Sequence, residues 1–464
     1  MDLLVRGGTV VTAAGSRPAD VAVEGERISA ILAPADGERA PEGAAEVVDA
    51  AGLLVLPGVI DVHTHTRVAS DAEPDRFFHD SVAAAFGGTT TLLAFNNPGT
   101  GSSPAAGRSL MTGLLEWRGA TDGDSAIDCA VSLAISGRMD DPLAELPAIV
   151  DAGVPTAKAF MVYDFRLEDD LLFSALRTLG RAGGMLQIHC EDPVLIGAAV
   201  ADALHRGNTA PRYHATSRPP IAEAIATARV MAFAEVAEAP AYVVHLSSIG
   251  ALAAVRAAKV RGIRAFAETC PHYLTLTEDR YADPDDGEVA KAIVSPPLRS
   301  AADRDALWAG LADGTLDLVA TDHVPDRTAV EKRVEGASFD QISNGAPGIE
   351  TLLTLVYSEG VARSRIGLER MVELLSSTPA RLFGLRSKGA IEPGLDADLV
   401  LFDPTARRTI RAADLHHTSD YTPYEGMSVT GAVNSVFVRG QPVIRDGAFV
   451  GQRGFGRFVE RRLG

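Results

Sequence analysis

The sequence predicts a (β/α)8 barrel of the TIM-barrel type, with a small discontinuous β-sandwich formed by both chain ends. Residues 55–387 alternate short apolar runs with helix-patterned segments, which is typical of a parallel sheet with crossover helices. The apolar runs number eight, the number of strands that closes such a barrel. Residues 1–54 and 388–464 hold strand-like segments without helical periodicity, so we expect them to build one β-rich unit around the barrel.

The two ends are interpreted from their short apolar segments and the turn residues between them. The N-terminal segments are LLVRGGTVV, DVAVEGERISAIL and AAEVVDAAG, with glycines and the stretch 34–43 supplying turns. The C-terminal segments are DADLVLFDP, VNSVFVRGQPVI and DGAFVG.

The barrel strands are predicted, in chain order, at 53–63, 89–95, 128–136, 155–161, 185–190, 241–247, 263–270 and 316–322. The segments 171–184, 221–239 and 304–314 carry apolar residues at three- and four-residue spacing and are predicted helices. Two long stretches, Gly99–Gly107 and Pro325–Gly348, are candidate loops over the barrel mouth.

Several of the predicted strands end in residues that can bind a metal ion. His63 and His65 stand two apart on one strand, so their imidazoles share a face and can hold one ion, whereas a lone buried histidine is more often a core residue. His189 and His245 end two further strands, and each taken alone fits core packing as well as metal binding. Asp322 ends the last strand. It fits either an ion ligand that also carries a proton or the N-cap of a following helix.

Lys158 is unusual because an unpaired lysine inside a barrel costs several kcal/mol. It can extend to the rim or pair with a carboxylate. Alternatively, its amine adds CO2 to form a carbamate, which bridges two cations as a long carboxylate would. The sequence leaves these alternatives open.

Charge and composition exclude some classes of partner. The net charge of −18 argues against nucleic acid or an anionic membrane surface. The start of the chain has no signal-peptide pattern, and no apolar run approaches the roughly 20 residues that cross a bilayer. Three widely spaced cysteines predict reduced thiols in a cytoplasmic protein.

Taken together, the motifs PGVIDVHTH, AAAFGGTTT, KAFMVYD, PRYHATSRPP, YVVHLSS, ETCPHYL, ATDH, ISNGAPGIET and DYTPYEG resemble the amidohydrolase superfamily. Within it they are similar to the cyclic amidase branch, which holds dihydropyrimidinases, hydantoinases, allantoinases and dihydroorotases. The segments PRYHATSRPP, ISNGAPGIE and DYTPYEG look most like dihydropyrimidinase and hydantoinase. The resemblance covers nearly the whole chain.

This resemblance implies two divalent ions, zinc first among them, with manganese, cobalt and iron(II) also accepted by such ligands. One ion would be held by His63, His65 and Asp322 and the other by His189 and His245, with the Lys158 carbamate bridging them. A bridging hydroxide would attack the ring amide, and Asp322 would pass its proton to the leaving nitrogen. The Tyr163 hydroxyl would stabilise the oxyanion, and Ser295 and Asn344 would hold the substrate's amide edge through backbone groups. Without the resemblance, a rim aromatic and turn residues explain these last three equally well.

One departure concerns Arg67. The run HTHTR is similar to the HxHxR of dihydroorotases, whose arginine clamps a substrate carboxylate, and Asn97 aligns with the asparagine that shares this task. Arg67 and Asn97 would then favour an acidic ring. The alternative is that Arg67 pairs with acidic residues of its own loop, Asp71, Glu73 or Asp75.

The leading hypothesis is therefore a metal-dependent hydrolase that opens dihydropyrimidines or 5-substituted hydantoins to N-carbamoyl amino acids. The runner-up is a dihydroorotase- or allantoinase-like amidase for acidic or polar rings. Two further hypotheses are an esterase on the same barrel and a metal-free scaffold of the collapsin response mediator type. The resemblance also implies a homo-oligomer, a dimer or a tetramer, with the C-terminal tail reaching a neighbour or lying on the surface.

Overall fold

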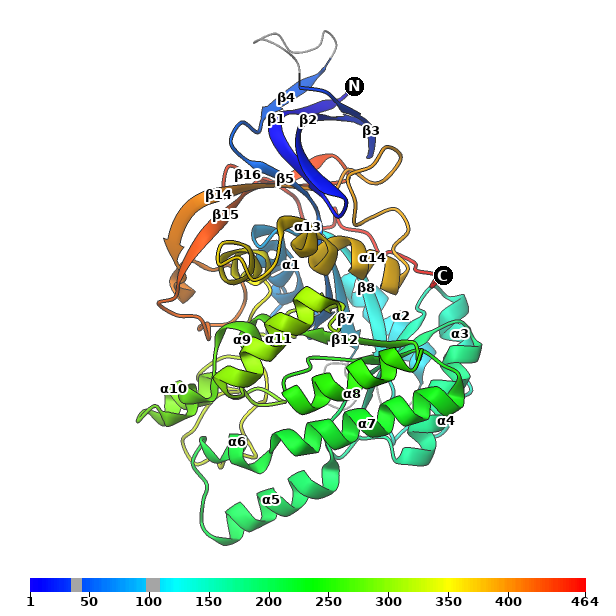
Figure 1. Cartoon of the computed structure of the whole chain (residues 1–464), viewed down its shortest axis with the longest axis vertical. Coiled ribbons are helices and arrows are strands. Elements are labelled where there is room, and N and C mark those ends of the chain that lie inside the picture. The colour runs from blue at the N-terminus through cyan, green and yellow to red at the C-terminus, as the bar shows by residue number, and fades with distance from the viewer. Residues whose placement is uncertain (35–43, 97–108) are drawn as a thin grey trace.

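The computed structural model describes residues 1–34, 44–96 and 109–464, and it contains a barrel of parallel strands beside a separate outer sheet (Figure 1). The barrel strands follow one another in chain order, each hydrogen-bonded to the next. They are β6 (Val59–Thr64), β7 (Thr89–Asn96), β8 (Asp128–Ala134), β9 (Thr156–Phe160), β10 (Met185–His189), β11 (Ala241–Val243), β12 (Ala265–Thr269) and β13 (Leu318–Val319). Every predicted run overlaps one of these strands, so the predicted fold class is confirmed; the first run, 53–63, also spans β5 (Leu54–Pro57), which belongs to the outer sheet.

The first and last strands meet just beyond the end of β13. The Asp322 amide donates to the carbonyl of His63 at 2.9 Å, and the His65 amide donates to the carbonyl of His323 at 2.7 Å. These two bonds bring residues of the predicted site together at the seam where the barrel closes.

Helices surround the strands, and the predicted helices at 171–184, 221–239 and 304–314 are confirmed as α4, α7 and α11. The α-helices are α1 (Arg76–Phe86), α2 (Leu110–Thr121), α3 (Leu146–Asp151), α4 (Asp169–Arg181), α5 (Pro193–His205), α6 (Tyr213–Ser217), α7 (Pro220–Ala237), α8 (Ile249–Val260), α9 (Pro271–Thr275), α10 (Asp286–Lys291), α11 (Ala301–Asp313), α12 (Leu352–Val356), α13 (Leu368–Val372) and α14 (Thr378–Phe383). Short 3₁₀ segments, η1 (Glu278–Ala282) and η4 (Ala412–Asp414), and π segments, η2 (Tyr357–Val361) and η3 (Glu373–Ser377), complete the set.

Strand alternation decides which side chains reach the barrel interior. On β9, Ala157 and Ala159 belong to the apolar cluster between strands and helices, as do Leu186 and Ile188 on β10. Because successive side chains of a strand point to opposite faces, Lys158 and the other residues of opposite parity face inward. The apolar outer face thus fixes the direction of the polar inner one.

Both chain ends form one nine-stranded outer sheet, as expected. Its strands are β1 (Leu3–Thr12), β2 (Gly15–Glu24), β3 (Arg27–Leu32), β4 (Glu46–Asp49), β5 (Leu54–Pro57), β14 (Leu399–Thr409), β15 (Ser428–Val438), β16 (Gln441–Arg445) and β17 (Ala448–Phe449). The ends join at β5, which pairs with β1 on one side and β14 on the other. Val5, Val21, Leu401 and Phe437 share one buried cluster, so the two ends also share a core.

The C-terminal tail lies on its own chain. The Val459 amide donates to the carbonyl of Cys129 on β8 at 2.8 Å. The fully buried Arg461 donates to the Val131 carbonyl at 2.6 Å and to the Thr156 hydroxyl at 2.9 Å. The tail therefore packs against β8 and β9. Among the described residues, no helix combines the length and apolarity that a membrane span requires.

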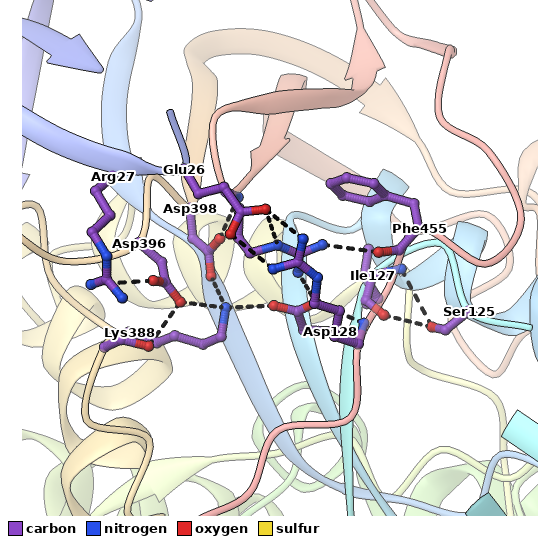
Figure 2. Close-up of polar contacts among 12 residues, drawn as sticks. Glu26, Arg27, Ser125, Ile127, Asp128, Lys388, Asp396, Asp398 and Phe455 are labelled. Atoms are coloured by element: carbon purple, nitrogen blue, oxygen red, sulfur yellow. Dashed lines mark hydrogen bonds and ion pairs between the residues drawn. The ribbon is translucent and has the colours of Figure 1, made fainter. Parts of the chain in front are cut away.

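A buried ion cluster joins the outer sheet, the barrel and the tail (Figure 2). Lys388 donates to Asp128 of β8 and to Asp398 beside β14, both at 2.7 Å. Arg439 also pairs with Asp128, and it donates to the Phe455 carbonyl of the tail at 2.9 Å. These charges are nearly inaccessible to solvent, so each depends on its partners.

We predict that Lys388→Met destabilises the protein by about 3–5 kcal/mol, because it leaves Asp128 and Asp398 buried without their shared cation. The measurement is the free energy of unfolding from urea titration. Arg457→Gln is the matched control, since Arg457 pairs with Glu26 at the exposed edge of the same cluster and exposed pairs contribute at most about 1 kcal/mol. Equal effects of the two substitutions would contradict the interpretation of the buried cluster.

Candidate metal centre

Three predicted ligands lie together at the barrel seam. The imidazoles of His63 and His65 approach one carboxylate oxygen of Asp322, with Nε2–Oδ1 distances of 2.9 Å and 3.2 Å. One ligand atom from each of these residues falls within 4.8 Å of the others, which is the geometry of a shared ion. The N-cap alternative for Asp322 is wrong, because the next helix in the chain begins at Leu352.

The other predicted ligands complete a ring around the same rim. His189 ends β10 and His245 lies two residues beyond β11, and their ring centroids are 4.5 Å apart. The His245 ring is also 5.4 Å from the His63 ring. The Lys158 ammonium reaches in from β9 above the rings of Phe95 and Phe160, at 4.5 Å and 5.1 Å from their centroids.

Left-handed backbone at the rim turns several of these side chains toward one another. Tyr163, His245 and Asp322 have φ angles of 76°, 39° and 51°. Such conformations cost energy for residues with a Cβ, and they persist where surrounding contacts over-determine them. Their concentration beside the histidines is typical of a functional site.

The donor atoms of the rim fit a divalent ion. His63 Nε2, His245 Nδ1 and Lys158 Nζ are buried and lack a hydrogen-bond partner among the described residues. His63 Nε2 lies near Asp322 without hydrogen-bond alignment, as expected where both atoms point to a common centre. Lys158 is fully buried, so neither rim extension nor a hydrogen-bonded carboxylate accounts for it.

The protonation states of His65, His189 and Asp322 suit metal binding, whereas the carboxylates of Asp322 and Glu268 raise the pKa of His63 despite its burial, so His63 would release a proton on binding an ion. Burial lowers the pKa of His65 to about 4 and also lowers that of His189, so both imidazoles are neutral near pH 7. Burial would raise the pKa of Asp322, but the charge of His63 and the close approach of the His65 imidazole hold it well below its usual range. Burial lowers the pKa of Lys158 to about 8. Neutral imidazole and ionised carboxylate are the ligand forms that a divalent ion requires.

Two carboxylates that the sequence analysis did not assign contact residues at the seam where the barrel closes. Glu268 on β12 contacts His63 Nδ1 and accepts from the Tyr242 hydroxyl at 2.6 Å. Asp61 accepts from the Thr321 hydroxyl at 2.5 Å, next to Asp322. The available signal for Glu268 was a carboxylate within an apolar strand segment, AFAET.

Tyr163 lies between the predicted metal ligands and a buried ion pair. Its ring centroid is 5.5 Å from that of His189, and the Arg218 guanidinium lies 5.4 Å from the Tyr163 ring centroid. Arg218 pairs with Glu191, which also contacts His189 Nε2 at 2.7 Å. Sequence reasoning missed this pair, although Arg218 and Glu191 orient a predicted ligand and a predicted oxyanion residue together.

The residues expected to hold the amide edge lie on two loops. Asn344 Nδ2 is 3.5 Å from the Tyr163 hydroxyl, which brings the Asn344 loop to the rim. Ser295 is buried, and its hydroxyl lies 3.4 Å from Nε2 of His214.

Arg67 does not pair with its own loop. Its guanidinium donates to Asp326 at 2.7 Å and to Glu331 at 2.6 Å, both in the loop that follows β13. Glu73, a predicted partner, pairs instead with Arg76 and Arg327. Asn97 and the candidate loop Gly99–Gly107 lie outside the described residues.

Comparison with known proteins gives full-length similarities. The chain matches the amidohydrolase family over residues 164–443. It is 38% identical over 463 residues to a D-hydantoinase of Streptomyces coelicolor, covering 99% of this chain and 97% of that protein. It is 39% identical over 466 residues to a D-phenylhydantoinase of Escherichia coli, covering 100% and 98%. A solved dihydropyrimidinase structure from Brevibacillus agri matches with a TM-score of 0.93 at 39% identity, covering 100% and 99%.

Proposed function

This chain belongs to the amidohydrolase family, in which it is a cyclic amidohydrolase of the hydantoinase and dihydropyrimidinase type, and we propose that it opens 5-substituted hydantoins or dihydropyrimidines to N-carbamoyl amino acids. The observation that carries this proposal is the convergence of six polar side chains from five strand ends on one rim. Full-length similarity to hydrolases and the presence of all six argue against the metal-free scaffold.

We assign two divalent ions to the rim, with zinc as the first candidate. His63, His65 and Asp322 would hold one, and His189 and His245 the other. Bound there, the ions would supply Lewis acidity and lower the pKa of water. The unpartnered buried donors and the neutral imidazoles of His65 and His189 support this assignment.

We propose that Lys158 acts as a carbamate, whose terminal carboxylate would help to hold both ions. Its amine nitrogen would bond to the carbon of CO2 and release a proton, which leaves a carboxylate at the end of the side chain. Burial supports this step because it lowers the pKa of Lys158 to about 8, so that a fraction of the amine is neutral near pH 7. An anion between cations also removes the cost of an unpaired buried ammonium.

The protein's own groups then direct hydrolysis. Asp322 accepts a proton as water attacks the ring carbonyl carbon, and it delivers that proton to the ring nitrogen as the C–N bond breaks. The Tyr163 hydroxyl donates to the carbonyl oxygen as that oxygen becomes negative. Backbone groups of Ser295 and Asn344 hold the second amide edge of the ring.

The surroundings of Arg67 favour neutral rings over acidic ones. Its guanidinium already has two carboxylate partners, Asp326 and Glu331. A substrate carboxylate would have to displace one of them and would lie beside the other, and juxtaposed like charges are unfavourable. This pairing disfavours the dihydroorotase-like activity.

We predict that kcat/KM for hydantoin and dihydrouracil exceeds that for 5-carboxymethylhydantoin and dihydroorotate by at least about 10-fold, or about 1.4 kcal/mol. The measurement is steady-state ring opening by the metal-loaded enzyme. Arg67→Gln should leave the ratio between neutral and acidic rings unchanged. Faster turnover of acidic rings, abolished by that substitution, would establish a carboxylate clamp; no ring opening at all would refute the proposed function.

We also propose a homo-oligomer in the cytoplasm. The described cysteines Cys129, Cys190 and Cys270 are free and buried, which suits a reducing compartment. Helix α5 projects from the barrel body and buries only Ile196 of its own residues (Figure 1). Val194 of α5 and Ile221 of α7 are 74% and 56% exposed, and the two helices begin side by side, where the Asp192 amide donates to the Ala222 carbonyl at 3.1 Å, so a second copy could cover both side chains.

If this face is the contact between copies, the double substitution Val194→Glu and Ile221→Glu should reduce the molar mass in light scattering to that of one chain. Val260→Glu is the matched control, because Val260 on α8 is 83% exposed and lies on another helix. An unchanged mass for the double variant, or a monomeric parent protein, would contradict the proposed contact.

A further inference from the structure

Lys332 is a buried lysine that the proposed chemistry does not use. It lies in the loop between β13 and α12 and is 3% exposed. Its ammonium donates to the carbonyl of Ile293 at 2.8 Å and to the carbonyl of Ser343 at 2.6 Å. One side chain therefore ties together two segments that come from different parts of the sequence.

Both carbonyls stand next to residues of the proposed ring-edge site. Ile293 precedes Ser295 by two residues, and Ser343 directly precedes Asn344. The position of the Lys332 ammonium thus fixes the distance between the two peptides expected to hold the second amide edge. No other side chain among the described residues has a hydrogen bond to both of these carbonyls.

Apolar residues shield the hydrogen bonds of Lys332 from water, and a carboxylate balances the charge of its ammonium. Ile293 and Ile342 form a buried apolar cluster, against which Val334 and Ala337 pack. The buried Asp326 carboxylate lies 3.8 Å from the Lys332 ammonium and also accepts from Arg67. Because Arg67 follows His65 by two residues, the same carboxylate links the ring-edge segments to the metal-ligand strand.

We propose that Lys332 is a positioning residue that sets the width of the ring-edge site by fixing the Ser295 and Asn344 peptides relative to each other. This inference rests on the proposed function, and it extends it to substrate specificity. Lys332 contacts no reacting atom; it acts through the backbone groups that do. Displacing such groups by a fraction of an ångström weakens binding of a ring whose imide edge they recognise.

The test is Lys332→Met, which keeps the chain length and apolar contacts and removes the donors. We expect KM for hydantoin to rise about 10-fold while kcat falls less than about 3-fold, since binding rather than transition-state chemistry is lost. KM for a hydantoin methylated at its imide nitrogen should change little, because that ring already lacks the contact. Lys291→Met is the matched control, as Lys291 is a neighbouring lysine whose partner is Glu288.

Amide hydrogen exchange provides a readout that does not depend on turnover. In Lys332→Met, exchange should accelerate in peptides that cover 293–296 and 343–346 and stay unchanged at β6, β10 and β11. Asp326→Asn is a second variant, which keeps the shape and removes the shared countercharge, and it should raise the same KM. Asp326→Asn replaces Lys332→Met as the test variant if Lys332→Met does not fold.

Unchanged KM and unchanged exchange in a folded variant would overturn the inference. So would equal losses for both rings or loss of bound metal, since these indicate a general structural role. If the parent enzyme opens no ring, the proposed function fails, and acceleration confined to the two segments still supports the positioning role.

Discussion

The meeting of Asp322 with His63 and His65 is the interaction on which the rest of the site depends. The Asp322 amide closes the barrel onto the His63 carbonyl, and its carboxylate contacts both imidazoles. Behind it, Asp61 and Glu268 hold Thr321 and His63 in place. The contacts that close the barrel therefore also bring the site residues together. A polar cluster this deeply buried is stable only when its members pair with one another.

Three buried lysines show how different surroundings give one residue type different roles. Lys388 lies between two carboxylates, which raise its pKa and make it a permanent cation that joins barrel to outer sheet. Lys332 meets two carbonyls and one carboxylate and fixes loop geometry. The Lys158 ammonium lies over the rings of Phe95 and Phe160 without a hydrogen-bond partner among the described residues, and burial lowers its pKa to about 8. Of the three, Lys158 is the one whose surroundings favour chemical modification over a structural role.

The pattern of neighbouring residues in the sequence was sufficient to predict the barrel strands and where they end. Alternating apolar runs located every barrel strand, and their ends marked the residues that the structure brings together around His63 and Asp322. Ion-pair partners that are far apart in the sequence could not be predicted. Arg67 pairs with Asp326 and Glu331 more than 250 residues away, and no spacing rule in the sequence distinguishes these acids from the nearer Glu73. The sequence left open what the tail contacts; it lies at the surface along β8 and β9 of its own chain, where Arg461 finds buried acceptors.

The most direct test of the account is anomalous X-ray scattering from crystals of the metal-loaded enzyme. We predict two metal peaks per chain, one bounded by His63, His65 and Asp322 and the other by His189 and His245, with a carboxylated Lys158 between them. A catalytically active enzyme with a single peak, or with peaks elsewhere and an unmodified Lys158, would contradict the two-metal centre.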